Sequence, residues 1–269
     1  MTQETSSHEH VIEIEDLVTG FGEITIHDHL NLAVRRGEVI GVVGGSGTGK
    51  SVLLKTIISL IKPRSGNIRM FGQNALSLNE TEQRQLDRRL GVLFQDGALF
   101  SAMTVAQNIM APLREHLDIS DALASEIAAM KITMSGLPLD AAIKYPSELS
   151  GGMRKRAGLA RALAMDPEIV FLDEPTAGLD PIGAAKFDEL ILSLQDTLGL
   201  TVFMVTHDLD SLNRITDRVA VLADRKVSAI GPIEEVRQDP HPWIREYFSG
   251  PRGRAAMVST VQASEEATG

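Results

Sequence analysis

The stretch GVVGGSGTGKSVLLK, residues 41–55, constrains the fold of this chain more than any other part of its sequence. It overlaps a short, mostly apolar segment, Glu38–Val43, that is typical of a buried parallel strand. After Lys50, apolar residues recur at intervals of three and four, which predicts a helix. These residues are Leu53, Leu54, Ile57, Ile58 and Ile61. A glycine-rich turn is therefore expected to join a buried strand directly to a helix.

The turn itself matches the pattern G-x-x-x-x-G-K-[ST] from Gly44 to Ser51. Glycines let several backbone N–H groups converge on one oxyanion, and the helix N-terminus adds roughly half a positive charge. This is the chemistry of a loop that binds nucleotide phosphates, with Lys50 on the β and γ phosphates and Ser51 on Mg²⁺. The predicted nucleotide-binding residues are Gly44, Gly45, Ser46, Gly47, Thr48, Gly49, Lys50, Ser51 and Val52. An ordinary flexible turn is the alternative, and the flanking strand and helix argue against it.

Two carboxylates follow a second buried strand, in EIVFLDEP at Glu168–Pro175. Ligands of α/β sheets bind beyond the C-terminal ends of the strands. Asp173 is therefore expected to hold the Mg²⁺ shell, and Glu174 to face the attacking water as general base. Taken alone, the two acids could simply keep the strand exit soluble. Beside a phosphate-binding loop, they indicate hydrolysis of a nucleoside triphosphate.

A third element, ELSGGMRKRAGLARALA at residues 148–164, starts a helix with Ser150, Gly151 and Gly152. Bare backbone donors at a helix N-terminus make a second phosphate-binding end. If the two ends cannot reach one nucleotide, two copies of the chain must face each other head to tail. Each copy would then cover the γ-phosphate held by the other.

Composition narrows the function classes. The chain has 269 residues, 43% of them apolar, which is enough for one large or two modest domains. It contains no cysteine, which excludes disulfides and thiolate metal sites. Its net charge of −10 disfavours nucleic acid as a partner. No apolar run is long enough to span a bilayer, and the N-terminus lacks a secretory pattern, so a cytosolic chain is expected.

Local patterns predict further elements. Alternation over Val11–Val18 and spacing of two within Ile24–Val34 indicate two strands. Ser77 and Glu80 predict a capping box for a helix that runs to about Arg89.

Residues 105–145 are expected to be mostly helical, with one apolar stripe. The stripe consists of Ile119, Leu123, Ile127 and Met130. Strands that alternate with helices imply a mainly parallel sheet with helices on both faces. Residues 1–10 are predicted to be a disordered lead, and the tail at 249–269 to be poorly ordered unless something binds it.

In order and spacing, these elements resemble the ATP-binding subunits of ABC transporters over about residues 11–248. The resemblance implies an α/β fold with a P-loop NTPase (RecA-like) core, an antiparallel β part and an α-helical subdomain at about residues 97–160. It also implies that two copies bind and hydrolyse ATP between them.

By the same resemblance, Phe21 stacks on adenine, Gln95 touches Mg²⁺ and water, and His207 in VTHD contacts the γ-phosphate. Residues 150–152 belong to the signature that meets the partner's nucleotide, and Asp180 in AGLD belongs to the D-loop. Each of these residues would have an ordinary structural explanation if it stood alone, and their joint order and spacing favour the family roles. The implied catalytic residues are Glu174, His207 and Gln95, and the implied Mg²⁺ ligands are Ser51, Gln95 and Asp173.

Three positions depart from the family pattern. The fifth signature residue is Met153 where glutamine is usual, and Lys155 replaces a second common glutamine. Met153 leaves the backbone donors intact, so ATP binding is expected to survive. Phe21 stands where tyrosine is commoner, which keeps the stacking surface and loses a hydroxyl.

At the subfamily level, FQDGALFSAMTVAQNIMAPLREH at residues 94–116 resembles the ATPases of Mla (maintenance of lipid asymmetry) and related MCE-type systems. This implies phospholipid movement between bacterial inner and outer membranes, from the cytoplasmic side of the inner membrane. The implied partners are a multi-spanning permease, an MCE-domain lipid-binding protein and often a small STAS-domain protein. Leu99, Phe100 and Met103 are predicted to form an apolar socket for the permease, unless they pack under the helical subdomain.

Two other kinds of ABC ATPase remain as alternatives: the ATPase of an importer for a small solute, and a soluble ATPase that acts without a transporter. The single cassette, the lack of long heptads and the negative charge disfavour the second. A P-loop GTPase would need NKxD, which is absent.

At the carboxyl end, HPWIREYF, residues 241–248, places Trp243, Tyr247 and Phe248 together. These aromatic side chains could dock on a neighbour or close the chain's own core. The tail beyond Gly250 is predicted to contact the second copy.

Overall fold

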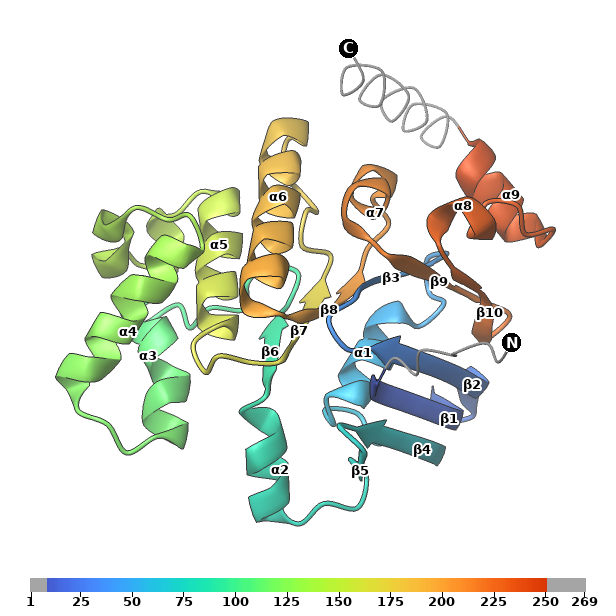
Figure 1. Ribbon diagram of the computed structural model, residues 1–269, viewed down its shortest axis with the longest axis horizontal. Coiled ribbons are helices and arrows are strands. Elements are labelled where there is room, and N and C mark those ends of the chain that lie inside the picture. The colour runs from blue at the N-terminus through green and yellow to red at the C-terminus, as the bar shows by residue number, and fades with distance from the viewer. Residues whose placement is uncertain (1–8, 251–269) are drawn as a thin grey trace, which may run out of the picture.

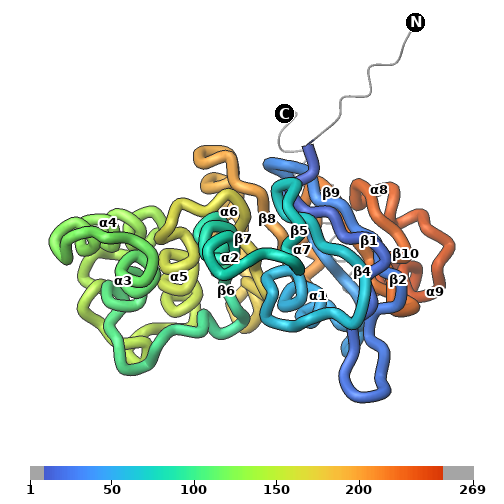
Figure 2. The backbone as a smooth tube through the Cα atoms, turned by 90° about the horizontal axis from the view of Figure 1, so that it is seen from below, coloured from blue at the N-terminus to red at the C-terminus, as the bar shows by residue number. Residues whose placement is uncertain are grey.

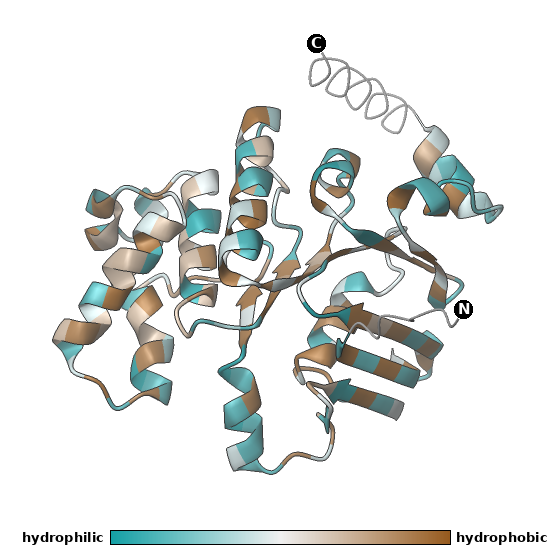
Figure 3. Cartoon of the chain, viewed as in Figure 1, coloured by the Kyte–Doolittle hydropathy of each residue, from teal (hydrophilic) through white to brown (hydrophobic). Residues whose placement is uncertain are grey.

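The computed structural model describes residues 9–250, and its strands form two sheets (Figure 1). The first sheet is antiparallel, with the order β2-β1-β4-β5. Its strands are β1 (His10–Phe21), β2 (Ile24–Arg35), β4 (Ser65–Met70) and β5 (Gln73–Asn74). Side chains alternate between core and solvent along them, which Figure 3 shows as bands of brown and teal.

The second sheet has the order β10-β9-β3-β8-β7-β6, and all of its neighbouring strands are parallel except β10 against β9. Its strands are β3 (Val39–Gly44), β6 (Leu90–Leu93), β7 (Ile169–Asp173), β8 (Thr201–Val205), β9 (Arg218–Ala223) and β10 (Lys226–Gly231). Every residue of β3, β7 and β8 is buried, because both faces of this sheet are covered.

The helices cover the second sheet and build a separate block. They are α1 (Lys50–Ile57), α2 (Glu80–Asp87), α3 (Val105–His116), α4 (Asp121–Met134), α5 (Gly151–Ala162), α6 (Pro181–Leu198), α7 (Leu209–Ile215), α8 (Ile233–Val236) and α9 (Pro242–Ser249). Two short 3₁₀ turns, Leu139–Ile143 and Pro146–Glu148, precede α5. No helix within residues 9–250 combines the length and apolar character that crossing a bilayer requires.

Three apolar cores hold these layers together. The first lies between the antiparallel sheet, α1 and one face of the parallel sheet. The second lies on the other face, beneath α6, α7 and the C-terminal helices α8 and α9. The third is made by α3, α4 and α5 and forms the helical block at the left of Figure 1. The α/β core, the antiparallel β part and the helical part expected from the sequence are therefore all present.

Several predicted boundaries change. The strand expected at Val11–Val18 is longer, and it includes His10, which had been placed in the disordered lead. The capping box was predicted at the wrong register: Asn79 accepts hydrogen bonds from the N–H groups of Thr81 and Glu82, and Glu82 caps in return. Ser77 instead donates to the carbonyl of Asn74 within the preceding turn.

The apolar stripe predicted for residues 119–130 is not the buried face of α4. Leu123 is 44% exposed and Met130 is 49% exposed. The side chains that pack inward are Ala124, Ala128, Lys131 and Ile132. Small residues let α4 approach its neighbours closely. Ile132 is a large apolar side chain buried in the contact, whereas Leu123 and Met130 lie at its rim.

The parallel sheet positions the functional loops. Because β3, β6, β7 and β8 are parallel, their carboxyl ends lie at one edge. The glycine-rich turn, Gln95, the two carboxylates and His207 all follow those ends directly. An α/β sheet binds its ligands at this edge.

Candidate functional site

The glycine-rich turn forms a tight loop between β3 and α1. Gly47 and Gly49 have φ angles of 79° and 94°, in the left-handed region that favours glycine. A Cβ atom on Gly49 would lie 2.6 Å from Nε2 of His27 on β2, and it would also clash with Ile26. The loop therefore rests directly on the antiparallel sheet, and glycine is required there for both conformation and space.

Lys50 is held inside this loop. Its ammonium donates hydrogen bonds to the backbone oxygens of Gly44 at 2.8 Å and Gly45 at 3.0 Å. Burial lowers the pKa of Lys50, and the nearby carboxylates Glu174 and Asp173 oppose that shift. The arrangement keeps a cation folded back over the loop that a phosphate group would enter.

Ser51 and Asp173 come together from two different elements. The Ser51 hydroxyl donates a hydrogen bond to Oδ1 of Asp173 at 3.0 Å. Burial raises the pKa of Asp173, while the hydrogen bond from Ser51 works against that rise. A hydroxyl and a carboxylate oxygen are hard donors of the kind that Mg²⁺ accepts beside phosphate oxygens and water. The two residues thus fit a Mg²⁺ site.

Glu174 adopts an unusual backbone conformation directly after β7. Its φ angle is 51°, which costs a non-glycine residue on the order of 1–3 kcal/mol unless surrounding contacts impose it. Its N–H donates to the carbonyl of Val205 at 2.8 Å, and its own carbonyl accepts from the Lys155 ammonium at 2.8 Å. Both backbone groups of Glu174 are therefore anchored.

The Glu174 carboxylate meets His207. Oε2 of Glu174 lies 2.8 Å from Nδ1 of His207. The glutamate side chain is largely buried, whereas His207 is more than half exposed at the end of β8. The two predicted catalytic side chains are thus in contact, with one open flank where a substrate can approach.

The carboxyl-terminal helix α9 contacts two of these loops. The Tyr247 hydroxyl donates to the backbone oxygen of His207 at 3.1 Å. Trp243 stacks on Tyr247 with ring centroids 4.7 Å apart, and a Cβ atom on Gly45 would lie 3.2 Å from the indole Nε1. Phe248 is buried in the chain's own core. The aromatic group at residues 241–248 therefore supports the site of its own chain, and the tail beyond Gly250 lies outside the described residues.

Phe21 and Gln95 stand apart from these contacts. Phe21 is 54% exposed at the end of β1, on the hairpin to β2 that projects in Figure 2. Arg64 braces this hairpin by donating to the backbone oxygens of Gly22 and Ile24. Gln95 is exposed just beyond β6. An exposed aromatic ring on a braced hairpin offers a stacking surface.

The second predicted phosphate-binding end begins α5. The Ser150 side chain accepts a hydrogen bond from the N–H of Met153 at 3.3 Å, and Gly151 is exposed with open space around it. Asp180 caps α6 by accepting from the N–H groups of Ile182 and Gly183. Figures 1 and 2 both place α5 in the helical block and α1 on the far side of β6 and β7.

Sequence reasoning missed part of the site. Lys155 was noted only as a departure from a common glutamine, yet its ammonium binds the Glu174 backbone. The contact of Tyr247 with the His207 loop was also not foreseen. Tyr247 comes near the site because the carboxyl-terminal helix packs back onto the sheet. Local sequence patterns do not predict such packing.

Together, the parallel-sheet edge, the phosphate loop and the paired carboxylates define a P-loop ATPase of the cassette type. The ABC transporter family profile matches residues 27–177, more than half of the 269 residues. The chain belongs to this family, as an ATP-binding subunit that hydrolyses ATP.

Relatives extend over most of the chain. The intermembrane phospholipid transport ATP-binding protein MlaF of Haemophilus influenzae is 38% identical over 243 residues, which is 90% of this chain and 92% of that protein. MlaF of Escherichia coli K12 is 37% identical and covers 89% of each chain. The probable ribonucleotide transport ATP-binding protein mkl of Mycobacterium tuberculosis is 37% identical, over 96% of this chain and 71% of that protein.

The fold is shared with solved cassettes. A dimeric ATP-binding cassette in a post-hydrolysis state, bound to ADP and Pi, superposes with a TM-score of 0.76 at 29% identity. That match covers 82% of this chain and 98% of the solved one. The protein cbiO1 of Clostridium perfringens, part of the ABC transporter complex cbiONQ, gives a TM-score of 0.75 at 28% identity.

Proposed function

We propose that this chain is the ATPase of a system that moves phospholipid between the inner and outer membranes of a bacterium. The observation that carries the proposal is the near full-length match to MlaF, which covers 90% of this chain and 92% of the Haemophilus influenzae protein. The chain would work at the cytoplasmic face of the inner membrane, held there by a permease. An MCE-domain lipid-binding protein and a small STAS-domain protein would complete the system.

Two copies would bind two ATP molecules head to tail. The separation of α1 from α5 supports this arrangement. In a head-to-tail pair, the start of α1 in one copy faces the start of α5 in its partner. Lys50 would hold the β and γ phosphates of one ATP, while Ser150 and Gly152 of the second copy would cover its γ-phosphate. A related cassette bound to ADP and Pi is also dimeric, which is consistent with two copies acting together.

Within this pocket, Glu174 would accept a proton from the attacking water, and His207 would steady the γ-phosphate. Gln95 would contact the same water, and Phe21 would stack on adenine. Mg²⁺, held by Ser51, Asp173 and Gln95, would offset charge on the phosphoryl group. Hydrolysis removes the γ-phosphate that joins the two copies, so the dimer loosens and the permease is driven through its cycle.

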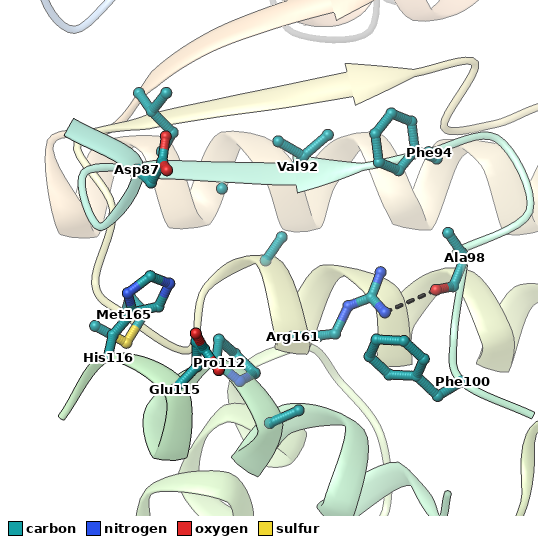
Figure 4. Close-up of a pocket in the computed structure, with 14 residues that line it drawn as sticks. Asp87, Val92, Phe94, Ala98, Phe100, Pro112, Glu115, His116, Arg161 and Met165 are labelled. Atoms are coloured by element: carbon teal, nitrogen blue, oxygen red, sulfur yellow. Dashed lines mark hydrogen bonds between the residues drawn. The ribbon is translucent and has the colours of Figure 1, made fainter. Parts of the chain in front are cut away.

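A groove beside Gln95 suits the permease. It has a volume of about 540 Å³ and lies between β6, α3, α5 and the loop after Gln95 (Figure 4). Phe100 is exposed at its wall, whereas Leu99 packs into the helical core. Arg161 fixes the loop by donating to the backbone oxygens of Ala98 at 2.7 Å and Gly97 at 3.0 Å. A rigid groove with an exposed aromatic ring can receive a short helix of a membrane partner.

The groove assignment has its own test. Phe100→Asp should prevent copurification of the chain with the permease, because a charge would enter the apolar wall. Ile143→Asp is a matched control, since Ile143 is 79% exposed and does not line the groove. Equal permease binding by both variants would exclude this groove as the docking site.

Reconstitution of the transporter in liposomes tests which substrate it moves. The complete transporter would be placed in liposomes with fluorescent phospholipid, and ATP-dependent transfer to acceptor vesicles would be measured. We expect transfer that stops when Glu174→Gln is introduced. The mkl relatives carry a ribonucleotide transport name, so the same liposomes are loaded with ribonucleotides. ATP-dependent release of the loaded ribonucleotides without lipid transfer would favour the importer alternative.

A further inference from the structure

Lys155 is a buried lysine without a carboxylate partner. It lies on the inner side of α5, and only 6% of the residue is exposed. Among the ion pairs of residues 9–250, none within 4.0 Å includes it. Burial lowers the pKa of Lys155, and the carboxylates of Asp96 and Glu174 partly offset this effect. A buried cation that is not used for an ion pair calls for another explanation.

Within the described part of the chain, the Lys155 side chain makes one hydrogen bond, and that bond identifies its role. Nζ donates to the backbone oxygen of Glu174 at 2.8 Å. Hydrogen bonds from a charged donor are stronger than neutral ones. This bond crosses from α5 in the helical block to the end of β7 in the parallel sheet. It therefore joins two parts of the molecule at the predicted general base.

The Glu174 backbone needs such support, because Glu174 is one of nine non-glycine residues within 9–250 that have a positive φ angle. It is in the left-handed region with φ at 51°, and its N–H is already fixed on the carbonyl of Val205. The Lys155 bond fixes its other backbone group. With both groups anchored, the side chain projects to within 2.8 Å of His207. The N–H of Ala177 also donates to the Glu174 carbonyl, at 3.2 Å. Loss of the charged Lys155 bond would leave the carbonyl on that longer, neutral bond alone and would let the Glu174 carboxylate shift from this position.

We propose that Lys155 is a positioning residue that holds the Glu174 backbone in its catalytic conformation and so links the start of α5 to the general base of the same chain. The inference rests on the proposed role of Glu174. Ser150 begins the helix that carries Lys155, and the partner's γ-phosphate would bind at that end. When one ATP binds at the α5 terminus, the Lys155 contact would thereby set the geometry of Glu174 at the second ATP, which the same chain holds through Lys50.

The test compares Lys155→Met with Lys155→Gln in the full chain. Methionine keeps an unbranched side chain and removes the donor, whereas glutamine keeps an N–H donor without the charge. For Lys155→Met we expect kcat for ATP to fall by about 10-fold to 10²-fold, the range reached when a catalytic group is misplaced by about 1 Å. KM and the Kd of a fluorescent ATP analogue should stay within about twofold. Lys155→Gln should recover most of the lost kcat.

Lys131→Met is the matched control. Lys131 is the other buried lysine of the helical block, 1% exposed, and it pairs with Asp166 away from the catalytic loops. Its replacement should lower Tm and leave kcat per folded molecule unchanged. If Lys131→Met lowers kcat as much as Lys155→Met does, the effect is general destabilisation, and the positioning role is wrong.

Two further outcomes would overturn the inference. Unchanged kcat in Lys155→Met would do so, as would equal losses in Lys155→Met and Lys155→Gln. If Lys155→Met does not fold, Lys155→Gln carries the test: retained turnover supports the donor role, and loss with intact nucleotide binding contradicts it. Glu174→Gln is measured in parallel. Near-normal turnover in that variant would refute the proposed general base itself, whereas an inactive Glu174→Gln beside a normal Lys155→Met refutes only the role of Lys155.

Discussion

The two proposed phosphate-binding ends of this chain, at residues 44–51 and 150–152, differ in how completely the chain's own side chains fill them. At the first end, Lys50 folds back on Gly44 and Gly45, Ser51 reaches Asp173, and Gly49 presses against His27. At the second end, Gly151 is exposed and has open space where a side chain would stand. A substitution at the first end acts inside one molecule. A substitution at the second end should change turnover only when a second copy of the chain binds there.

The variant with the largest expected effect tests whether both proposed phosphate-binding ends take part in the same ATP hydrolysis. Glu174→Gln should lower ATP turnover by ~10²-fold or more, because the proposed general base is lost. Nucleotide binding should persist, and ATP should then hold two copies together. Turnover is measured by phosphate release, and association by light scattering with ATP against ADP. Normal hydrolysis would exclude the role of Glu174.

The next effect is confined to the first end. Gly49→Ala places a Cβ atom in a left-handed residue and against His27. It should lower the free energy of unfolding by about 1–3 kcal/mol and abolish ATP binding in the single chain. Denaturant titration and nucleotide titration measure the two losses. A stable, ATP-binding Gly49→Ala would show that the close approach to β2 is not needed.

The matched change at the second end should behave differently. Gly151→Ala meets open space in the single chain, so Tm and ATP binding should not change. Turnover should fall by about 10-fold, since the added methyl group would stand between the α5 terminus and the phosphate of a partner. A loss of ATP binding by isolated Gly151→Ala chains would contradict the contrast between the two ends.

The smallest expected effect is a pH dependence of the free energy of unfolding, which arises from His27 beside the first end. Burial lowers the pKa of His27 from 6.5 to about 4, and Nδ1 of this neutral ring lies 2.7 Å from the Thr19 hydroxyl. Between these two pKa values the unfolded chain binds the extra proton, so stability falls as pH falls. From pH 6.5 to 5.5 the loss should be about 1 kcal/mol. His27→Phe should remove this component in denaturant titrations at both pH values. An unchanged slope would show that burial does not lower the pKa of His27 in the folded chain.

The sequence predicted where the glycine-rich loop and the two acids lie better than it predicted the contacts that support them. The phosphate loop and the two acids are contiguous motifs, so their place after β3 and β7 follows from local pattern alone. The left-handed backbone of Glu174 has no local signal, because it depends on Val205 and Lys155 from elsewhere in the chain. Lys155 looked like a simple departure from glutamine until packing brought it to Glu174.

The capping box at the wrong register and the wrong buried face of α4 have physical reasons of the same kind. Ser77 and Asn79 both precede acidic residues at the right spacing, and only the fold decides which of them begins α2. On α4, apolar periodicity marks the larger side chains, whereas the close contact is made by Ala124 and Ala128. Hydrophobicity indicates that a helix has a buried face, but the size of the gap to its neighbours decides which face that is.

The position of Trp243 has a practical consequence. It is the only tryptophan in the chain, and its indole stands beside Gly45 while its stacked neighbour Tyr247 binds the His207 loop. The intrinsic fluorescence of the protein therefore comes chiefly from one fluorophore placed next to the glycine-rich loop that we propose binds the triphosphate. Its emission should shift when that loop fills, so the unlabelled protein carries its own optical reporter of occupancy.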